Sequence, residues 1–223
     1  MALMRPPPTV HLDLWKKELG RVPEYVWDQT DLETLILADN ALSEISERVG
    51  RLKKLRMLDL GHNTLTSVPD GLADLDGLTD FLYLHDNRLT SLPSSLARLT
   101  RLHYLNMSEN AFEVFPECVS SMSSLIELRA SDNYLASVPD SVGRLSRLRE
   151  LHLRNNKLTS LPVSMGMLQE LRHIDLRGNP LTHLPTEIAA LPRLEKLDLR
   201  WVDTLIPQSW IADLEARGCA VYR

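Results

Sequence analysis

The sequence predicts an α/β solenoid with a parallel β-sheet along its concave face, and three regularities of the chain support this prediction. An asparagine recurs seven times at intervals of 23 or 24 residues. Leucines precede these asparagines by eight, five and three residues with few exceptions, and proline follows six of them by six residues. A fixed period of this length is typical of chains built from stacked repeats. The asparagines are Asn40, Asn63, Asn87, Asn110, Asn133, Asn156 and Asn179.

Residues 148–170 show the repeating unit in its regular form. The apolar residues occupy unit positions 1, 4, 6, 11, 14, 18 and 21, counted from Leu148. The placement of Leu151 and Leu153 on either side of His152 predicts a half-buried strand, because successive side chains of a strand point to opposite faces. One unit has too few leucines to form a core alone. We therefore expect neighbouring units to bury these leucines against one another.

The asparagine and the proline of the unit have structural roles in this prediction. The asparagine stands at position 9, where the chain leaves the strand, and its amide can bond the backbone groups that the bend removes from the sheet. The proline at position 15 fixes φ on the return path, where no sheet hydrogen bond is lost. We therefore expect a stack of buried asparagines and convex segments that are extended or form short helices.

The unit resembles the leucine-rich repeat, whose L-x-x-L-x-L-x-x-N-x-L core forms one strand of a horseshoe. The length of 23 residues and the Leu-Pro pair at positions 14 and 15 resemble the Ras-suppressor, Scribble and Erbin type and the plant intracellular Ras-group proteins. This resemblance implies a protein that binds other proteins. Bacterial secreted ubiquitin ligases also carry such repeats, with shorter units and a following catalytic domain, so their activity is not expected. The core begins at Leu32, Leu55, Leu78, Leu102, Leu125, Leu148 and Leu171.

Irregular units at both ends of the array are interpreted as caps of a single domain. Residues 1–8 are expected to form a loose N-terminal tail, and residues 9–31 a degenerate capping repeat. Residues 32–193 hold the seven leucine-rich repeats. Residues 194–223 hold the last repeat and a C-terminal cap, in which SWIADLEARG predicts a short amphipathic helix and CAVYR a closing strand. The chain is therefore expected to be complete.

Composition and cysteine usage limit the possible partners and the location. The net charge of -5 argues against a nucleic-acid surface. No apolar run approaches the ~18 residues of a membrane span, and the first residues lack the apolar region of a signal peptide. Cys118 and Cys219 are expected to lie too far apart in a linear stack to form a disulfide. We predict a monomeric, cytoplasmic protein that binds neither nucleic acid nor membrane.

The first half of the expected concave face carries a cluster of large side chains. Side chains at unit positions 3, 5, 7 and 8 should lie on this face, and Met57, Phe81, Tyr83 and Tyr104 gather there. Folding does not require large apolar side chains on this open face, so they indicate an interaction site. The alternative is that they only cover one another and the nearby backbone. We predict a partner with an apolar patch ringed by lysine or arginine. The other candidate binding residues of this half are His85, Asp39, Asp59, Asp86 and Glu109.

The second half of the concave face balances five acids against five bases. Adjacent strands lie ~4.8 Å apart, so Arg154 is expected to reach Asp175, and Arg177 to reach Asp198. One interpretation is a polar lattice whose charges pair with one another. The other is a clamp for an anion or carboxylate. The candidate binding residues of this half are Arg129, Arg154, Arg177 and Arg200.

The most direct functional interpretation is an intracellular scaffold that binds another protein, with no enzymatic activity and no cofactor. The chain lacks the glycine-rich phosphate-binding, dinucleotide-binding, nucleophile-elbow and zinc-protease motifs. Two alternatives stay open. A metal-dependent or hydrolytic site could form from His62 and His85 with Asp39 or Asp86, which stand on adjacent strands. The chain could instead be an architectural spacer or a self-associating unit.

Overall fold

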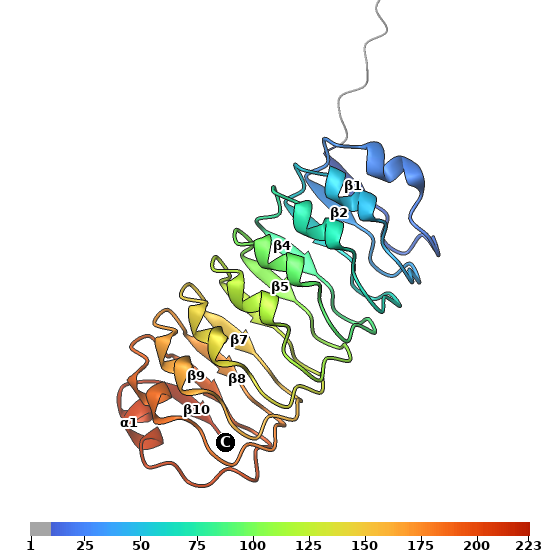
Figure 1. Ribbon diagram of the computed structural model, residues 1–223. Coiled ribbons are helices and arrows are strands. Elements are labelled where there is room, and N and C mark those ends of the chain that lie inside the picture. The colour runs from blue at the N-terminus through green and yellow to red at the C-terminus, as the bar shows by residue number, and fades with distance from the viewer. Residues whose placement is uncertain (1–9) are drawn as a thin grey trace, which may run out of the picture.

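The computed structural model describes residues 10–223, which form one ten-stranded parallel sheet. The strands follow one another in sequence order, so each repeat adds one strand beside the previous one (Figure 1). This confirms the predicted solenoid. The expected tail, residues 1–8, lies outside the described residues. The strands are β1 His11–Asp13, β2 Thr34–Ile36, β3 Met57–Asp59, β4 Phe81–Tyr83, β5 Tyr104–Asn106, β6 Glu127–Arg129, β7 Glu150–His152, β8 His173–Asp175, β9 Lys196–Asp198 and β10 Ala220–Tyr222.

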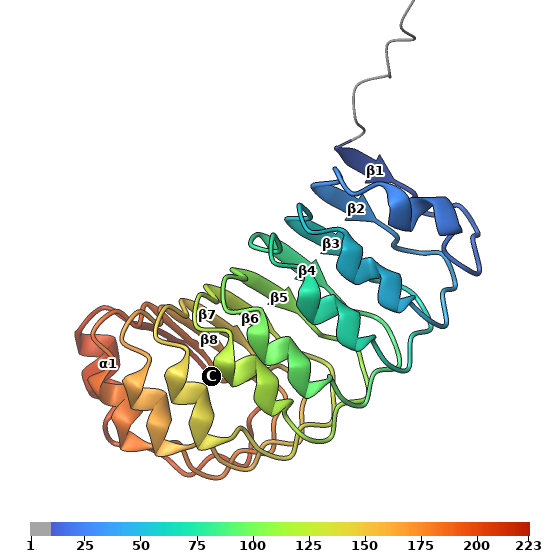
Figure 2. The same cartoon turned by 45° about the horizontal axis from the view of Figure 1, so that its top comes forward.

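A short 3-10 helix follows each of the first eight strands and lies on the side of the solenoid opposite the sheet (Figure 2). Proline stands directly before seven of these eight helices. Its fixed φ suits this place, and it has no N–H that would need a partner. The convex segments are therefore short helices. They are η1 Glu24–Asp28, η2 Glu47–Arg51, η3 Asp70–Asp74, η4 Ser94–Arg98, η5 Glu117–Ser121, η6 Asp140–Arg144, η7 Val163–Met167 and η8 Thr186–Ala190.

The leucines of successive repeats fill a single core between the sheet and the 3-10 helices. Leu151 and Leu153 are fully buried, and His152 between them is half-buried, as the alternation predicted. Phe112 and Trp27 are the largest fully buried side chains of this core. Each repeat contacts only its neighbours in such a stack, so the leucines of one unit are covered by those of the next.

The asparagines form the predicted buried ladder; six of the seven are buried and Asn87 is half-buried. Asn63 is representative. Its Nδ2 donates to the carbonyls of Leu37 and Leu60 at 3.1 and 3.0 Å, and its Oδ1 accepts the N–H of Leu42 at 2.9 Å. Leu37 and Leu42 belong to the preceding repeat, so each asparagine satisfies buried backbone groups of two repeats at once.

The end units continue this pattern in modified form. Asn40 donates to the carbonyl of Leu14 at 2.8 Å and accepts the N–H of Lys17 at 2.9 Å, which joins the first unit to the second. At the other end, helix α1 (Ile211–Ala216) buries Ile211 and Leu214, and β10 pairs with β9. Within residues 10–223, no helix has the length and apolar character to cross a membrane.

Replacing a core leucine should destabilise the chain far more than replacing a surface threonine. Leu153 is fully buried, so Leu153→Ala should lower the free energy of unfolding by ~2 to 5 kcal/mol. Thr159 is exposed, and Thr159→Ala should change it by no more than ~0.5 kcal/mol. Urea melts of the two variants measure the difference. Equal losses would contradict the assigned register.

Replacing one asparagine of the ladder should lower the stability of the fold, although no apolar volume is lost. Asn133 donates to the carbonyls of Met107 and Ser131 at 3.1 Å each and accepts the N–H of Phe112 at 3.1 Å. Asn133→Ala leaves these groups buried and unpaired, so the free energy of unfolding should fall by ~1 to 3 kcal/mol. Denaturant melts measure it. A variant that melts with the wild type would show that the ladder does not stabilise the fold.

Candidate functional site

Three adjacent strands bring the large concave side chains together. β4 points Leu82 into the core and directs Phe81 and Tyr83 to the opposite, concave side, where Phe81 is 42% exposed. Phe81 is the direct cross-strand partner of Tyr104 on β5 and of Met57 on β3. The side chains therefore lie on one continuous surface, which we call the aromatic patch (Met57, Phe81, Tyr83 and Tyr104).

The rings of the aromatic patch contact one another. The ring centroid of Phe81 lies 6.0 Å from that of Tyr83 and 5.5 Å from that of Tyr104, and the two tyrosine centroids are 5.1 Å apart. These separations are typical of favourable aromatic pairs. Partial burial raises the pKa of the Tyr83 phenol and raises the pKa of Tyr104 to about 12. The rings thus cover one another in part, while Phe81 stays open to a partner.

Two histidines extend this surface toward the N-terminus. The ring of His85 lies 5.9 Å from that of Tyr83 and 4.6 Å from that of His62. The His62 Nδ1 contacts Asp86 Oδ2 at 2.6 Å, and the two Nε2 atoms are 3.2 Å apart. Burial, then the neighbouring His62, lowers the pKa of His85. A Cβ at Gly61 would lie 2.4 Å from the His85 ring, so a larger residue here would force the His85 side chain to move. The sequence pattern did not reveal this contact.

The four acids predicted around the aromatic patch differ in their contacts. Asp39 lies 3.6 Å from Lys16 of the degenerate first unit, so this acid already has a basic neighbour. Asp59 accepts the N–H of Gly61 at 2.9 Å, and burial raises the pKa of its carboxyl group. Glu109 is exposed and forms no ion pair within residues 10–223. It is the acid of this group most open to a partner's charge.

Backbone conformation explains several of these acids. The residue before each asparagine of the ladder, and before Val202 in the last repeat, has a φ between 50° and 66°. Asparagine, aspartate, histidine and glycine tolerate this left-handed region better than other residues. The backbone conformation therefore limits which residues can stand at unit position 8. The sequence pattern alone had predicted only that this position lies on the concave face. The residues are Asp39, His62, Asp86, Glu109, Asp132, Asn155, Gly178 and Trp201.

The arginines of the second half are paired with acids of the same face. Arg177 donates to both oxygens of Asp175 at 2.8 and 2.6 Å. Arg200 bonds Asp198 in the same manner at 2.9 and 2.7 Å. In both pairs the acid precedes the arginine by two residues, so the two side chains extend from the same side of one strand. Such two-point contacts fix the orientation of a guanidinium group.

The predicted contact between Arg154 and Asp175 is wrong. Arg154 donates instead to Asp132 of the preceding repeat at 2.8 Å. Arg177 already bonds both oxygens of Asp175, which explains the different choice. The other predicted contact is present, with Arg177 3.6 Å from Asp198. Arg154, Arg177 and Arg200 thus pair with acids of the same face, which is the arrangement that the first interpretation describes.

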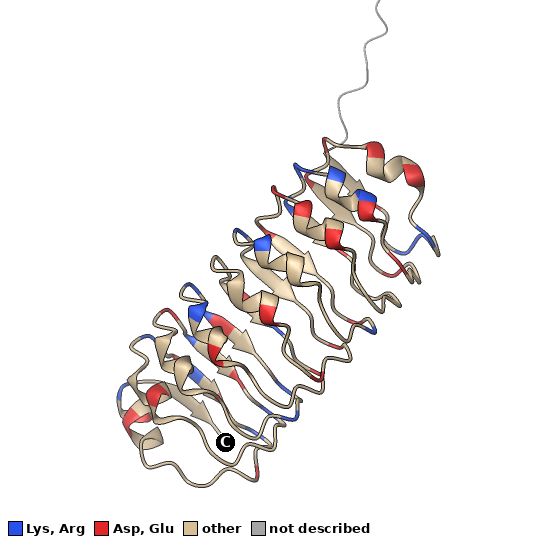
Figure 3. Ribbon diagram, viewed as in Figure 1, with Lys and Arg blue, Asp and Glu red and all other residues tan. Residues whose placement is uncertain are grey.

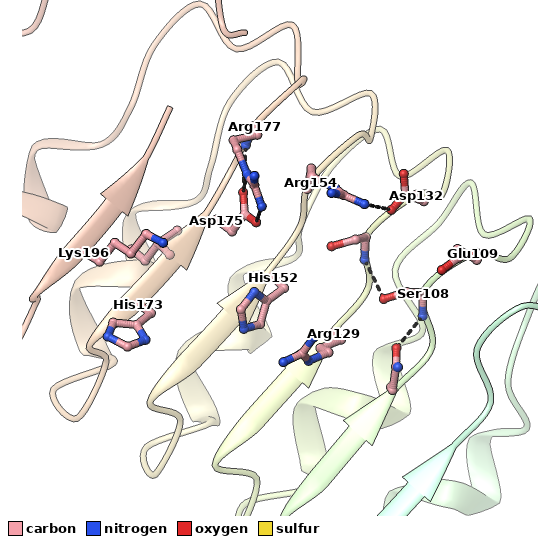
Figure 4. Close-up of a pocket in the computed structure, with 13 residues that line it drawn as sticks. Ser108, Glu109, Arg129, Asp132, His152, Arg154, His173, Asp175, Arg177 and Lys196 are labelled. Carbon is pink, nitrogen blue, oxygen red and sulfur yellow. Dashed lines mark hydrogen bonds and ion pairs between the residues drawn. The ribbon is translucent and has the colours of Figure 1, made fainter. Parts of the chain in front are cut away.

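Arg129 connects the two halves of the concave face. Its guanidinium carbon lies 6.0 Å from the ring centroid of Tyr104, and its Nε donates to Glu127 Oε1 at 2.5 Å. A hollow of about 330 Å³ opens beside it, lined by polar and charged side chains that include His152 and Arg154 (Figure 4). Acidic and basic residues are both spread along the solenoid (Figure 3). The aromatic patch is thus the apolar part of a mainly charged face.

The structure also locates the groups that could perform chemistry. Burial raises the pKa of the Cys118 and Cys219 thiols, which disfavours the thiolate that a nucleophile requires. Among residues 10–223, the potential metal ligands that gather in a group of three or more are Glu127, Glu150 and His152. This group differs from the histidine and aspartate set that the sequence analysis considered.

Comparison with known families agrees with the repeat pattern. A family model described as leucine rich repeat matches residues 30–81, 80–135 and 146–201. These matches include all strands from β2 to β9 and the whole aromatic patch. Helix η6 lies in the gap between the second and third stretches.

Known proteins match parts of the chain. The volume-regulated anion channel subunit LRRC8E of Xenopus laevis is 37% identical over 87 residues, which are 38% of this chain and 11% of that protein. Plant intracellular Ras-group-related LRR protein 8 of Oryza sativa subsp. japonica is 34% identical over 101 residues, 43% of this chain and 26% of that protein. The chain thus spans less than a third of the length of either relative.

A solved structure shares the fold. The ectodomain of the plant membrane receptor kinase GASSHO1/SCHENGEN3 from Arabidopsis thaliana superimposes with a TM-score of 0.72 and 34% sequence identity. The match covers 80% of this chain and 22% of that chain. That structure is a complex with CASPARIAN STRIP INTEGRITY FACTOR 2.

The burial of Tyr104 should make the stability of the chain depend on pH in the alkaline range. The folded chain keeps the Tyr104 proton up to about pH 12, whereas the unfolded chain releases it near 10.0. The stabilisation is therefore complete below the unfolded pKa and is lost as pH rises between these values. Tyr104→Phe should show a smaller fall of unfolding free energy over this range in denaturant melts. Identical pH profiles would contradict the burial of this phenol.

Proposed function

This chain belongs to the leucine-rich repeat family, and we propose that it is an intracellular scaffold that binds another protein on its concave face. Solenoids of this family present a long concave surface that other proteins bind. We infer that the continuous ten-stranded sheet holds this surface in one shape without a partner. Binding then requires little ordering of the chain, which favours affinity.

The aromatic patch is the observation that carries this proposal. Four large side chains from three adjacent strands form one surface at the middle of a charged face. Aromatic side chains at the centre of a contact region supply most of the binding energy in protein interfaces. Phe81 is exposed although its neighbour Leu82 is fully buried, so the strand itself has no need of the Phe81 side chain for packing.

The surroundings of the patch define the chemistry of the partner. Glu109 is exposed beside it, and Asp86 is exposed next to His62. Arg129 stacks near Tyr104 at the opposite border, where its charge is balanced by Glu127. We infer that the partner presents apolar residues flanked by lysine or arginine, which would face Glu109 and Asp86.

The proposal also includes the cell compartment, the oligomeric state and the repeat type. The Cys118 and Cys219 thiols are both free and buried, which suits a reducing cytoplasm. The 23-residue unit and the similarity to a plant intracellular Ras-group-related protein support the Ras-suppressor-like type. We propose a monomer, and light scattering of the purified chain over a range of concentrations tests this. A concentration-dependent dimer would favour the self-associating alternative.

The proposal is tested by comparing partner capture between matched variants. The triple variant Phe81→Ala, Tyr83→Ala, Tyr104→Ala removes the rings of the patch. Tyr134→Ala removes an exposed tyrosine that lies outside the strands and serves as the control. We expect the wild type and Tyr134→Ala to capture the same partner proteins and the triple variant to lose them. Equal capture by all three folded chains would contradict a binding site at the patch.

Kinetic measurements with a purified partner should separate the roles of rings and charges. Tyr83→Ala should raise the off-rate by roughly thirtyfold, the effect of losing about 2 kcal/mol at a central contact. Glu109→Lys should instead lower the on-rate by a few fold and reduce its salt dependence, because rim charges act mainly on encounter. Surface plasmon resonance measures both rates. If Glu109→Lys raised the off-rate and Tyr83→Ala changed only the on-rate, the acid and not the ring would be the central contact.

A further inference from the structure

A group of metal-binding side chains lies beside the hollow in the second half of the concave face. Glu127 stands on β6, and Glu150 and His152 stand on β7. One potential ligand atom from each of these three residues lies within 4.8 Å of the others. His152 and His173 of the next strand both line the hollow (Figure 4). Arg129 bonds Glu127, and His152 shares a hydrogen bond with Glu150 at 3.2 Å. Within residues 10–223, no arginine bonds Glu150 or His152.

The distances within the group fit a single metal ion. The His152 Nε2 lies 3.2 Å from Glu150 Oε2 and 3.8 Å from Glu127 Oε1. Zinc bonds of ~2.0 to 2.2 Å in tetrahedral geometry place neighbouring donor atoms ~3.3 Å apart. The Nδ1 of His173 lies 3.5 Å from the other oxygen of Glu150, so it can act as a fourth ligand or orient that carboxylate. Small side-chain rotations therefore suffice to form the site.

The charges of the group favour a cation. Glu127 and Glu150 are direct cross-strand partners, a position in which two like charges destabilise a sheet. Their side chains are only 21% and 35% exposed, so water screens this repulsion incompletely. Arg129 offsets the charge of Glu127 through one oxygen. A divalent ion between the two carboxylates would offset both charges.

We propose that Glu127, Glu150 and His152 form a binding site for one divalent transition-metal ion, with zinc as the best fit. A set of one imidazole and two carboxylates suits zinc better than calcium or magnesium, which prefer oxygen ligands alone. The three residues leave a fourth position open toward the hollow, for His173 or a water molecule. This site is separate from the aromatic patch, so it stands whether or not the proposed function holds.

The test measures zinc binding by the purified full chain after treatment with a chelator and dialysis. Calorimetric titration with zinc sulfate should show one ion per chain, and cobalt(II) should give the visible absorption of a tetrahedral site. His152→Ala and Glu150→Gln should each weaken binding by at least tenfold. His62→Ala is the matched control, because His62 is a concave histidine outside the group, and it should bind as the wild type does.

A fourth variant tests the placement of the site beside Arg129. Arg129→Gln removes a positive charge next to the proposed ion and frees Glu127, so it should strengthen zinc binding by a few fold. Circular dichroism confirms that each variant is folded. Absence of zinc binding by the wild type would overturn the proposal. Binding that is lost with His62→Ala but kept with His152→Ala would overturn it as well, since the ion would then lie between His62 and His85.

Discussion

The fold depends on the bonds that each buried asparagine makes to the repeat before it. The amide of Asn63 bonds the N–H of Leu42 in the preceding repeat. It also bonds the carbonyl of Leu37, which Asn40 of its own repeat bonds as well. A buried backbone group without a partner is costly, so a repeat is stable only when the next one is in place. The leucines require the same arrangement. Stacking therefore satisfies the polar and the apolar demands of every unit together.

This constraint determines where the chain can carry function. Unit positions used for the core and the ladder are fixed, and position 8 is limited by its positive φ. Positions 3 and 5 have no such restriction, because their side chains leave the concave side of each strand. The chain fills them with rings at Phe81, Tyr83 and Tyr104, and with the paired charges of Glu127 and Arg129 on the next strand. The binding surface is thus defined by residues that stacking leaves free.

The sequence predicted the strands, the asparagine ladder and the neighbourhood of the aromatic side chains, because all three follow from a strict period. It did not predict the partner of Arg154, since a long side chain can reach acids on either side and the choice depends on Arg177. Nor could it reveal that Lys16 reaches Asp39, which is a contact from a degenerate unit. The role of Gly61 beside His85 likewise depends on atomic distances rather than on a pattern.

Hydroxyl-radical footprinting of the chain, free and bound to its captured partner, tests the central claim most directly. Aromatic and methionine side chains react readily, so Met57, Phe81 and Tyr83 report on the concave face. Tyr134 and Met167 are exposed outside the sheet and report on the rest of the surface. The account predicts that the partner protects the concave residues and leaves Tyr134 and Met167 reactive. Protection confined to Tyr134 and Met167 would contradict it.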